Sequence, residues 1–124
     1  WASARMDDLV NFLPARLTCL LFAIFSSNPI QTLHQALRDA KRHRSPNAGW
    51  PESAMAWSIG IRLSGPRLYD GNLNNEPWIN SKGADGETAD ILKALRVFKM
   101  SMGTFVLALG ILLCFFIYLE LPRR

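Results

Sequence analysis

Two neighbouring carboxylates and two further polar side chains near the start of the chain could do chemistry together. They are Asp7, Asp8, Asn11 and Arg16. On a helix, spacings of three and four residues put side chains on one face, so both carboxylates are expected to share a face with Asn11. Adjacent carboxylates can hold Mg²⁺ together with the phosphates of a substrate. Pro14 is expected to break or kink the helix, which leaves Arg16 beyond the kink. The alternative is an acidic helix start, with Arg16 as an interfacial anchor.

A second set of polar groups lies in the turn Ser45–Glu52. It offers a hydroxyl, an amide, a flexible backbone and a carboxylate, from Ser45, Asn47, Gly49 and Glu52. A loop that opens onto a helix N-terminus can bind an anion through its N–H groups, which makes this turn a candidate substrate site. Arg62 and Tyr69 follow soon after it. The alternative is a connector between two helices, in which Asn and Ser satisfy only local backbone groups.

Several common kinds of site are not indicated by the sequence. It contains no GxxxxGK[ST], GxGxxG, HExxH or GxSxG motif. His34 and His43 are far apart and have no cysteine nearby, which argues against zinc. Cys19 and Cys114 lie in apolar stretches, where a packed and inert thiol is the usual case. Basic residues are not interleaved with aromatic ones, so nucleic acid is not expected as a partner.

The chain that must position these groups is short, apolar and weakly basic. It has 124 residues, 49% of them hydrophobic and 19% charged, with a formal net charge of +4. Residues Met100–Leu119 include no Asp, Glu, Lys or Arg, and a helix of about 20 residues spans roughly 30 Å, the thickness of a hydrocarbon core. A transmembrane helix is therefore predicted over 100–119. A second membrane segment is predicted over 9–27, where a full span and a re-entrant segment both fit because Pro14 and Arg16 interrupt it.

Residues 28–99 form a polar connecting region between these two segments. Asn28-Pro29 is typical of a helix cap followed by proline at the first helical position, and an amphipathic helix is expected after it. A short helix rich in small residues is expected over Ser53–Leu63, and Gly65-Pro66 is expected to end it.

The rest of the connecting region is predicted as a loop followed by a last helix. Residues 69–86 are expected to be loop, and the helix, capped by Asp85 or Thr88, is expected to continue into 100–119. The predicted fold class is all-α: an integral membrane protein with about two transmembrane segments. Most Lys and Arg outside the two apolar segments lie in residues 28–99, so the positive-inside rule places this region in the cytoplasm if 9–27 crosses the membrane.

Three ordered motifs resemble those of one known family. The stretch Arg5–Thr18 resembles a "DD..N..PARLT" pattern, Ser45–Ala56 resembles "SPNAGWPEAAMA", and Ile59–Tyr69 is similar to "LGVRLGGP..Y". Glu76–Ile79 matches a later and weaker element. These patterns are those of the adenosylcobinamide-phosphate synthase family, the cobalamin-biosynthesis membrane proteins called CobD or CbiB. Order and spacing fit over nearly the whole chain, with Ser53 and Ser64 standing where Ala and Gly are usual.

The resemblance implies an enzyme of cobalamin biosynthesis. It would be an ATP-dependent, amide-forming ligase that joins adenosylcobyric acid, through a propionate carboxyl, to an aminopropanol or its phosphate. ATP and Mg²⁺ are the implied cofactors, and membrane lipid, the corrinoid and the amino-alcohol phosphate are the implied partners. Other proteins of the pathway or further copies of the chain are possible partners as well. The implied location is the inner cell membrane, as a multi-pass protein. Since family members are longer and this chain starts without Met, residues 1–124 look like the C-terminal part of such an enzyme.

The resemblance identifies the motifs but does not assign roles to their residues, so the following roles are hypotheses. Asp7, Asp8 and Glu52 are the candidate catalytic residues: the two aspartates would orient Mg²⁺, and Glu52 would accept a proton from the attacking amine. Arg16, Arg62 and the run Lys41–Arg44 would offset negative charge on the substrates. The candidate substrate contacts are Asn11, Arg16, Ser45, Asn47, Gly49, Arg62 and Tyr69. A non-catalytic membrane subunit or sensor on the same scaffold, or a small basic protein of the membrane surface, is the alternative.

Overall fold

The computed structural model describes residues 2–120, with side chains from residue 5 onward except that of Tyr69. Helices dominate this part of the chain, and short strands occur only between the last two of them. In chain order the elements are α1 (Ala2–Val10), α2 (Phe12–Ile24), α3 (Pro29–Ala40), α4 (Gly49–Ile59), β1 (Leu63–Ser64), β2 (Arg67–Tyr69), β3 (Asn72–Asn74), β4 (Trp78–Ile79) and α5 (Thr88–Glu120).

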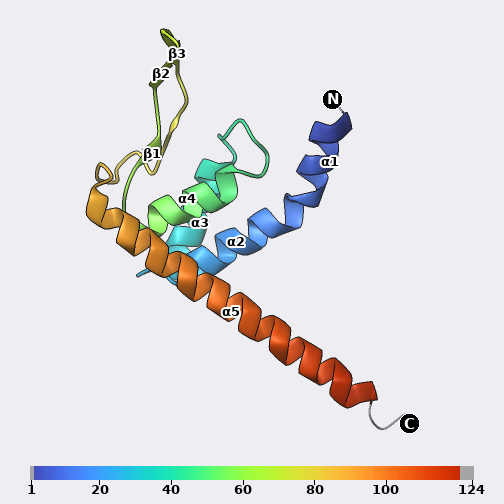
Figure 1. The fold of residues 1–124 in the computed structure, drawn as a ribbon. Helices are drawn as coiled ribbons and strands as arrows, with labels where there is room; N and C mark the ends of the chain where they lie inside the picture. Colours follow the sequence, from blue (N-terminus) through green and yellow to red (C-terminus); the bar gives the residue numbers. More distant parts are fainter. Residues whose placement is uncertain (1, 121–124) are drawn as a thin grey trace.

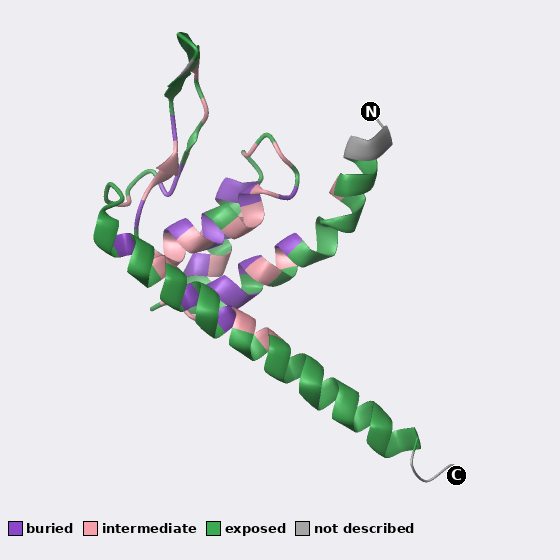
Figure 2. Ribbon diagram, viewed as in Figure 1, coloured by how far each residue is buried: buried purple, intermediate pink, exposed green. Residues whose placement is uncertain are grey.

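The core lies where α2, α3 and α4 pack together and the first half of α5 crosses them (Figure 1). Its buried members are Cys19, Phe22, Ala36, Ala54 and Val97. Burial is concentrated at this crossing, while α1 and the second half of α5 extend away from it and are exposed (Figure 2). The crossing therefore fixes the positions of the loops that join α1 to α2 and α3 to α4.

The break between α1 and α2 lies at Asn11, in the turn that precedes Pro14. Pro14 falls in the first turn of α2, where the missing N–H leaves no hydrogen bond within α2 itself unmade. A proline removes the helical hydrogen bond to the residue four positions before it, here Val10, so the predicted break before Arg16 is confirmed. Arg16 follows one turn into α2 and faces the loop before α4.

The predicted start of α3 is confirmed, and the predicted bounds of α4 are wrong. The Asn28 side chain accepts a hydrogen bond from the backbone N–H of Gln31 at 3.2 Å, and Pro29 follows as the first helical residue. Helix α4 begins at Gly49 and ends at Gly60, which adopts a left-handed conformation with φ of 77°. Gly60 ends the helix before Gly65-Pro66 is reached, because a left-handed residue satisfies the last carbonyls and turns the chain away.

The all-α prediction holds for most of the described chain but misses two small sheets. Strands β1 and β4 pair antiparallel, and β2 pairs with β3 in a hairpin. Asp70 and Gly71 form the hairpin turn, with φ of 48° and 77°. Two consecutive positive φ angles match the twist of paired strands, so this dipeptide favours a hairpin where the sequence reading expected only loop.

Helix α5 is the one helix of residues 2–120 that is long and apolar enough to cross a membrane. It has 33 residues, and none of its most apolar window is buried within the protein. Thr88 begins it, and it continues into 100–119 as expected. Helix α2 has 13 residues, which corresponds to roughly 20 Å and falls short of a hydrocarbon core of about 30 Å. A second span over 9–27 is therefore not shown.

Candidate functional site

The two polar motifs that the sequence singles out meet at Arg16. Its Nη1 donates to the side-chain oxygen of Asn47 at 2.7 Å and to the backbone oxygen of Phe12 at 2.9 Å. Its guanidinium carbon lies 3.6 Å from the ring centroid of Phe12 and 4.4 Å from that of Trp50. Stacking against two rings and a charge-assisted hydrogen bond fix the guanidinium in orientation. Helix α2 and the loop before α4 are thus joined through one side chain.

Asn47 is the centre of this arrangement. It is buried, accepts from Arg16, and donates through Nδ2 to the backbone oxygen of Asp8 at 2.8 Å. Trp50 completes the group by donating from its indole nitrogen to the backbone oxygen of Pro46 at 3.0 Å. We call Asp8, Arg16, Asn47 and Trp50 the Arg16 cluster.

The turn before α4 is held by Ser45 and Gly49. The Ser45 hydroxyl accepts from the backbone N–H groups of Asn47 and Ala48 at 3.4 and 3.2 Å. Gly49 packs so closely on the preceding segment that a Cβ there would lie 2.5 Å from the Cβ of His43. Both residues therefore shape the loop, and their contacts here are to the protein itself.

Glu52 lies in the first turn of α4 and faces His43. The distance from Glu52 Oε2 to His43 Nε2 is 3.4 Å, and 49% of the Glu52 side chain is exposed against 12% for His43. The other ring nitrogen, Nδ1, accepts from the backbone N–H of Ser45 at 3.0 Å. Because Nδ1 is an acceptor, the proton of a neutral His43 lies on Nε2, the ring nitrogen that lies 3.4 Å from the carboxylate.

The carboxylates of Asp7 and Asp8 lie on the exposed helix α1 and do not form a complete metal site by themselves. Asp7 accepts from the side chain of Asn11 at 2.9 Å, which confirms that these two residues share a face of α1. In the described part of the chain, no three His, Cys, Asp or Glu side chains come close enough together to hold a metal ion. Two carboxylates can therefore supply only part of the coordination of Mg²⁺, and substrate oxygens and water would have to complete it.

Arg62 is not brought to the Arg16 cluster. It donates to both carboxylate oxygens of Asp85, from Nε at 2.6 Å and from Nη2 at 2.9 Å. This hydrogen bonding lowers the pKa of Asp85 and raises that of Arg62. The guanidinium also lies 4.6 Å from the ring centroid of Trp78. Arg62 therefore braces β1 against the loop before α5, and the side chain of Tyr69 lies outside the described residues.

Trp50 is a member of the site that the sequence did not mark, and His43 was marked only as part of the basic run Lys41–Arg44. Trp50 lies inside the Ser45–Glu52 motif. It follows Pro46 by four residues, a spacing at which its indole N–H can reach the Pro46 backbone oxygen. For His43 the signal is weaker: it precedes the motif in a basic run, and only the fold turns it toward Glu52.

Known proteins resemble the chain over most of its length. The sequence profile of the CobD/Cbib protein family matches residues 1–98. A cobalamin biosynthesis protein CobD from Rhodobacter capsulatus is 50% identical over 111 residues, which cover 90% of this chain and 35% of the relative. The protein of that name from Sinorhizobium fredii is 43% identical over 126 residues, covering 96% of this chain and 39% of the relative.

The similarity extends beyond this pair. The CobD protein of Pelobacter propionicus is 42% identical over 122 residues, covering 91% of this chain and 37% of the relative. The chain thus spans little more than a third of the length of the curated relatives it matches. No solved structure matches it significantly. The family profile covers more than half of the residues and confirms the resemblance seen in the motifs, so the chain belongs to the CobD/Cbib protein family.

Proposed function

We propose that this chain is part of a membrane-associated enzyme of cobalamin biosynthesis. The reaction is the ATP-dependent joining of the propionate carboxyl of adenosylcobyric acid to an aminopropanol or its phosphate through an amide bond. The observation that carries the proposal is the convergence of two family motifs: Arg16 and the Asp8 backbone come from one, Asn47 and Trp50 from the other. If the polar residues of each motif satisfied only nearby backbone groups, no side-chain contact between the two motifs would be expected.

Arg16 is the residue best suited to hold an anionic substrate group. Its Nη1 is engaged by Phe12 and Asn47, and its Nη2 makes only a long contact of 3.4 Å to the Pro46 oxygen. The edge formed by Nε and Nη2 is the one that binds carboxylates and phosphates with two parallel hydrogen bonds. The side chain is half-buried, so this edge would act where water is partly excluded.

Glu52, with His43 beside it, is suited to take up the proton released when an amine attacks an activated carboxyl. Amide formation converts the ammonium of the tetrahedral adduct to a neutral nitrogen, while the oxygen that activates the carboxyl departs with its phosphate. Glu52 is exposed enough to reach a substrate, and Nε2 of His43 lies 3.4 Å from its carboxylate, where the imidazole can hold the carboxylate in position. ATP and Mg²⁺ belong to this proposal as the activating group and its counter-ion, with Asp7 and Asp8 as partial ligands.

In this proposal α5 attaches the chain to the membrane, and α2 does not cross the bilayer. If residues 9–27 crossed the bilayer, Asp8 and Asn47 would lie on opposite faces, about 30 Å apart. They are joined by a hydrogen bond of 2.8 Å. A re-entrant or interfacial α2 is compatible with this contact.

Complementation tests the proposal. A chimaera of the Rhodobacter capsulatus relative, in which this chain replaces the matching segment, is placed in a strain that lacks the relative and needs it for cobalamin. We expect the chimaera to restore cobalamin-dependent growth, and Arg16→Gln and Asn47→Ala to abolish or strongly reduce the corrinoid amide product. Arg96→Gln is the matched control, because Arg96 is an exposed cation of α5 that contacts neither motif.

Immunoblots of the membrane fraction keep the result interpretable. If the Arg16 and Asn47 variants accumulate to the level of the chimaera and still form the amide, the assignment of the Arg16 cluster is wrong. If the chimaera itself accumulates but gives no product while the native relative does, the proposed activity of this chain is wrong.

A further inference from the structure

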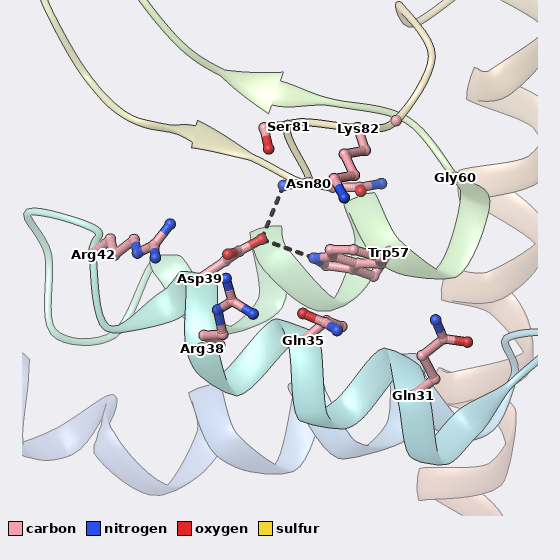
Figure 3. A pocket seen from close by; sticks show the side chains of 11 residues that line it. Gln31, Gln35, Arg38, Asp39, Arg42, Trp57, Gly60, Asn80, Ser81 and Lys82 are labelled. Atoms are coloured by element: carbon pink, nitrogen blue, oxygen red, sulfur yellow. Dashed lines mark hydrogen bonds between the residues drawn. The ribbon is translucent and has the colours of Figure 1, made fainter.

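A polar cavity lies between α3, the end of α4 and the turn formed by residues 80–83 (Figure 3). Its volume is about 500 Å³, which falls within the roughly 300–1,000 Å³ of small-molecule sites. It shares no lining residue with the Arg16 cluster or the turn Ser45–Glu52. Of the residues that the sequence marks for offsetting substrate charge, Arg42 alone lines this cavity.

One wall of the cavity is a polar stripe along α3. Its members are Gln31, Gln35, Arg38 and, just beyond the helix, Arg42. Spacings of four and three residues place them on one face, and the opposite face of α3 packs in the core through Ala36. Figure 3 shows the α3 side chains standing below the turn that carries Asn80 and Lys82. The stability of a surface helix does not require four long polar side chains to line one cavity.

Asp39 holds the walls of the cavity together. It is 9% exposed, and its Oδ2 accepts from the indole nitrogen of Trp57 at 2.8 Å and from the backbone N–H of Asn80 at 2.9 Å. One carboxylate from α3 therefore ties down α4 and the turn after β4. The cavity is built on fixed elements, which suits a site better than a chance gap between mobile side chains.

The cavity carries excess positive charge. Arg38, Arg42 and Lys82 line it, and none of them has an ion-pair partner among the described residues. Asp39 is the one acidic lining residue. Three cations against one carboxylate leave a formal excess of two positive charges. Cations gathered around one space repel each other unless an anion joins them.

We propose that this cavity binds a small polar molecule that carries a phosphate group. A phosphate monoester has a charge of about −1.5 to −2 at neutral pH, which balances the excess of the lining. Arg38 and Arg42 present guanidinium groups that bind phosphate oxygens with paired hydrogen bonds, and Lys82 adds a point charge from the facing turn. Gln31, Gln35 and Ser81 supply donors and acceptors for hydroxyls on the rest of the molecule.

Binding is tested on the full chain in zwitterionic phosphatidylcholine nanodiscs, with glycerol 3-phosphate as the probe. The readout is the NMR resonance of the Trp57 indole N–H, assigned with Trp57→Phe, because this group lines the cavity and donates to Asp39. We expect saturable movement of this resonance. Arg38→Gln and Lys82→Gln are each expected to weaken binding by about tenfold, the effect of losing one charge-assisted hydrogen bond.

Matched controls separate a site from general charge attraction. Arg96→Gln and Lys99→Gln remove the same charges from exposed positions of α5 that do not line the cavity, and both are expected to leave the affinity unchanged. Arg38 and Lys82 are exposed, so their variants are expected to keep the free Trp57 resonance in place, which confirms folding.

A second arm distinguishes a soluble phosphate ester from a lipid headgroup. In nanodiscs that contain phosphatidylglycerol, a lipid ligand would move the Trp57 resonance without any probe and block the effect of glycerol 3-phosphate. Either source supports a phosphate site. The proposal is overturned if neither the probe nor the anionic lipid moves the Trp57 resonance, or if both cavity variants bind as tightly as the unchanged chain.

Discussion

At the scale of single residues, Asn47 shows how a family motif acts through one amide. Its oxygen accepts from Arg16 and its nitrogen donates to the Asp8 backbone, so both ends of the amide are used in a buried position. Neither Asp nor Ala can replace it without loss, because Asp lacks the donor and Ala lacks both groups.

Replacing Asn47 by alanine is expected to lower the free energy of unfolding by about 1–3 kcal/mol, since it leaves the Asp8 carbonyl and one Arg16 donor without partners. Guanidinium unfolding in mild detergent, followed by tryptophan fluorescence, measures this. Asn72→Ala is the matched control, because Asn72 is an exposed hairpin residue. Equal stability of the two variants would contradict the role given to Asn47.

A second residue-scale prediction concerns Asp85 and pH. Its hydrogen bonds from Arg62 lower its pKa below the ordinary value of 3.8. The unfolded carboxyl therefore binds its proton at higher pH than the folded one, so the pair stabilises at neutral pH and loses this effect as pH falls below that value. Because Arg62 stacks on Trp78, protonation of Asp85 at low pH should change Trp78 fluorescence. Asp85→Asn mimics the protonated carboxyl, so it should show the low-pH fluorescence already at neutral pH. An unchanged signal in Asp85→Asn would rule out the coupling.

The sequence singles out several candidate site residues but not the side chains that contact them. Arg16, Asn47 and Glu52 stand out because each lies in a short polar stretch that resembles a family motif. Their contacts to Trp50 and His43 depend on how α2, α3 and α4 cross, and no local pattern encodes that crossing. The Arg62–Asp85 pair likewise joins residues that are far apart in sequence.

At the scale of elements, local signals predicted some structures and missed others. The Asn28 cap and the apolar run of 100–119 are strong local signals, and α3 and α5 follow them. Helix α4 begins at Gly49, before the predicted Ser53, although glycine is a poor helix former. In the fold, its missing side chain permits a close approach between α4 and the His43 segment.

This close approach predicts the cost of a larger residue at Gly49. In Gly49→Ala the new Cβ would meet the Ala40 backbone oxygen at 2.9 Å as well as the His43 side chain, so a loss of about 1–3 kcal/mol in stability is expected from overpacking. Gly103→Ala is the control, because nothing lies within 4 Å of a Cβ there and alanine favours a helix by about 0.5–1 kcal/mol. Detergent unfolding curves compare the two, and the argument fails if Gly49→Ala is as stable as Gly103→Ala.

At the scale of the whole molecule, the contact between Asp8 and Asn47 constrains the topology of the chain under the proposed membrane attachment through α5. Everything from α1 to the start of α5 is tied into one unit by α2–α4 packing and this hydrogen bond. We therefore expect Met6 and Ser81 to lie on the same side of the membrane, with Glu120 on the other side. The two-span prediction places Met6 opposite Ser81.

Cysteine labelling in intact cells separates these two topologies. Met6→Cys, Ser81→Cys and Glu120→Cys are each made in a chain carrying Cys19→Ala and Cys114→Ala, and a membrane-impermeant maleimide is applied with and without permeabilisation. Met6→Cys and Ser81→Cys should be labelled under the same condition, and Glu120→Cys under the opposite one. The cysteine-free chain sets the background, and full labelling after permeabilisation shows that each position is reactive. Opposite labelling of Met6→Cys and Ser81→Cys would establish that 9–27 crosses the bilayer, and the Asp8–Asn47 contact could then not exist in the membrane-bound protein.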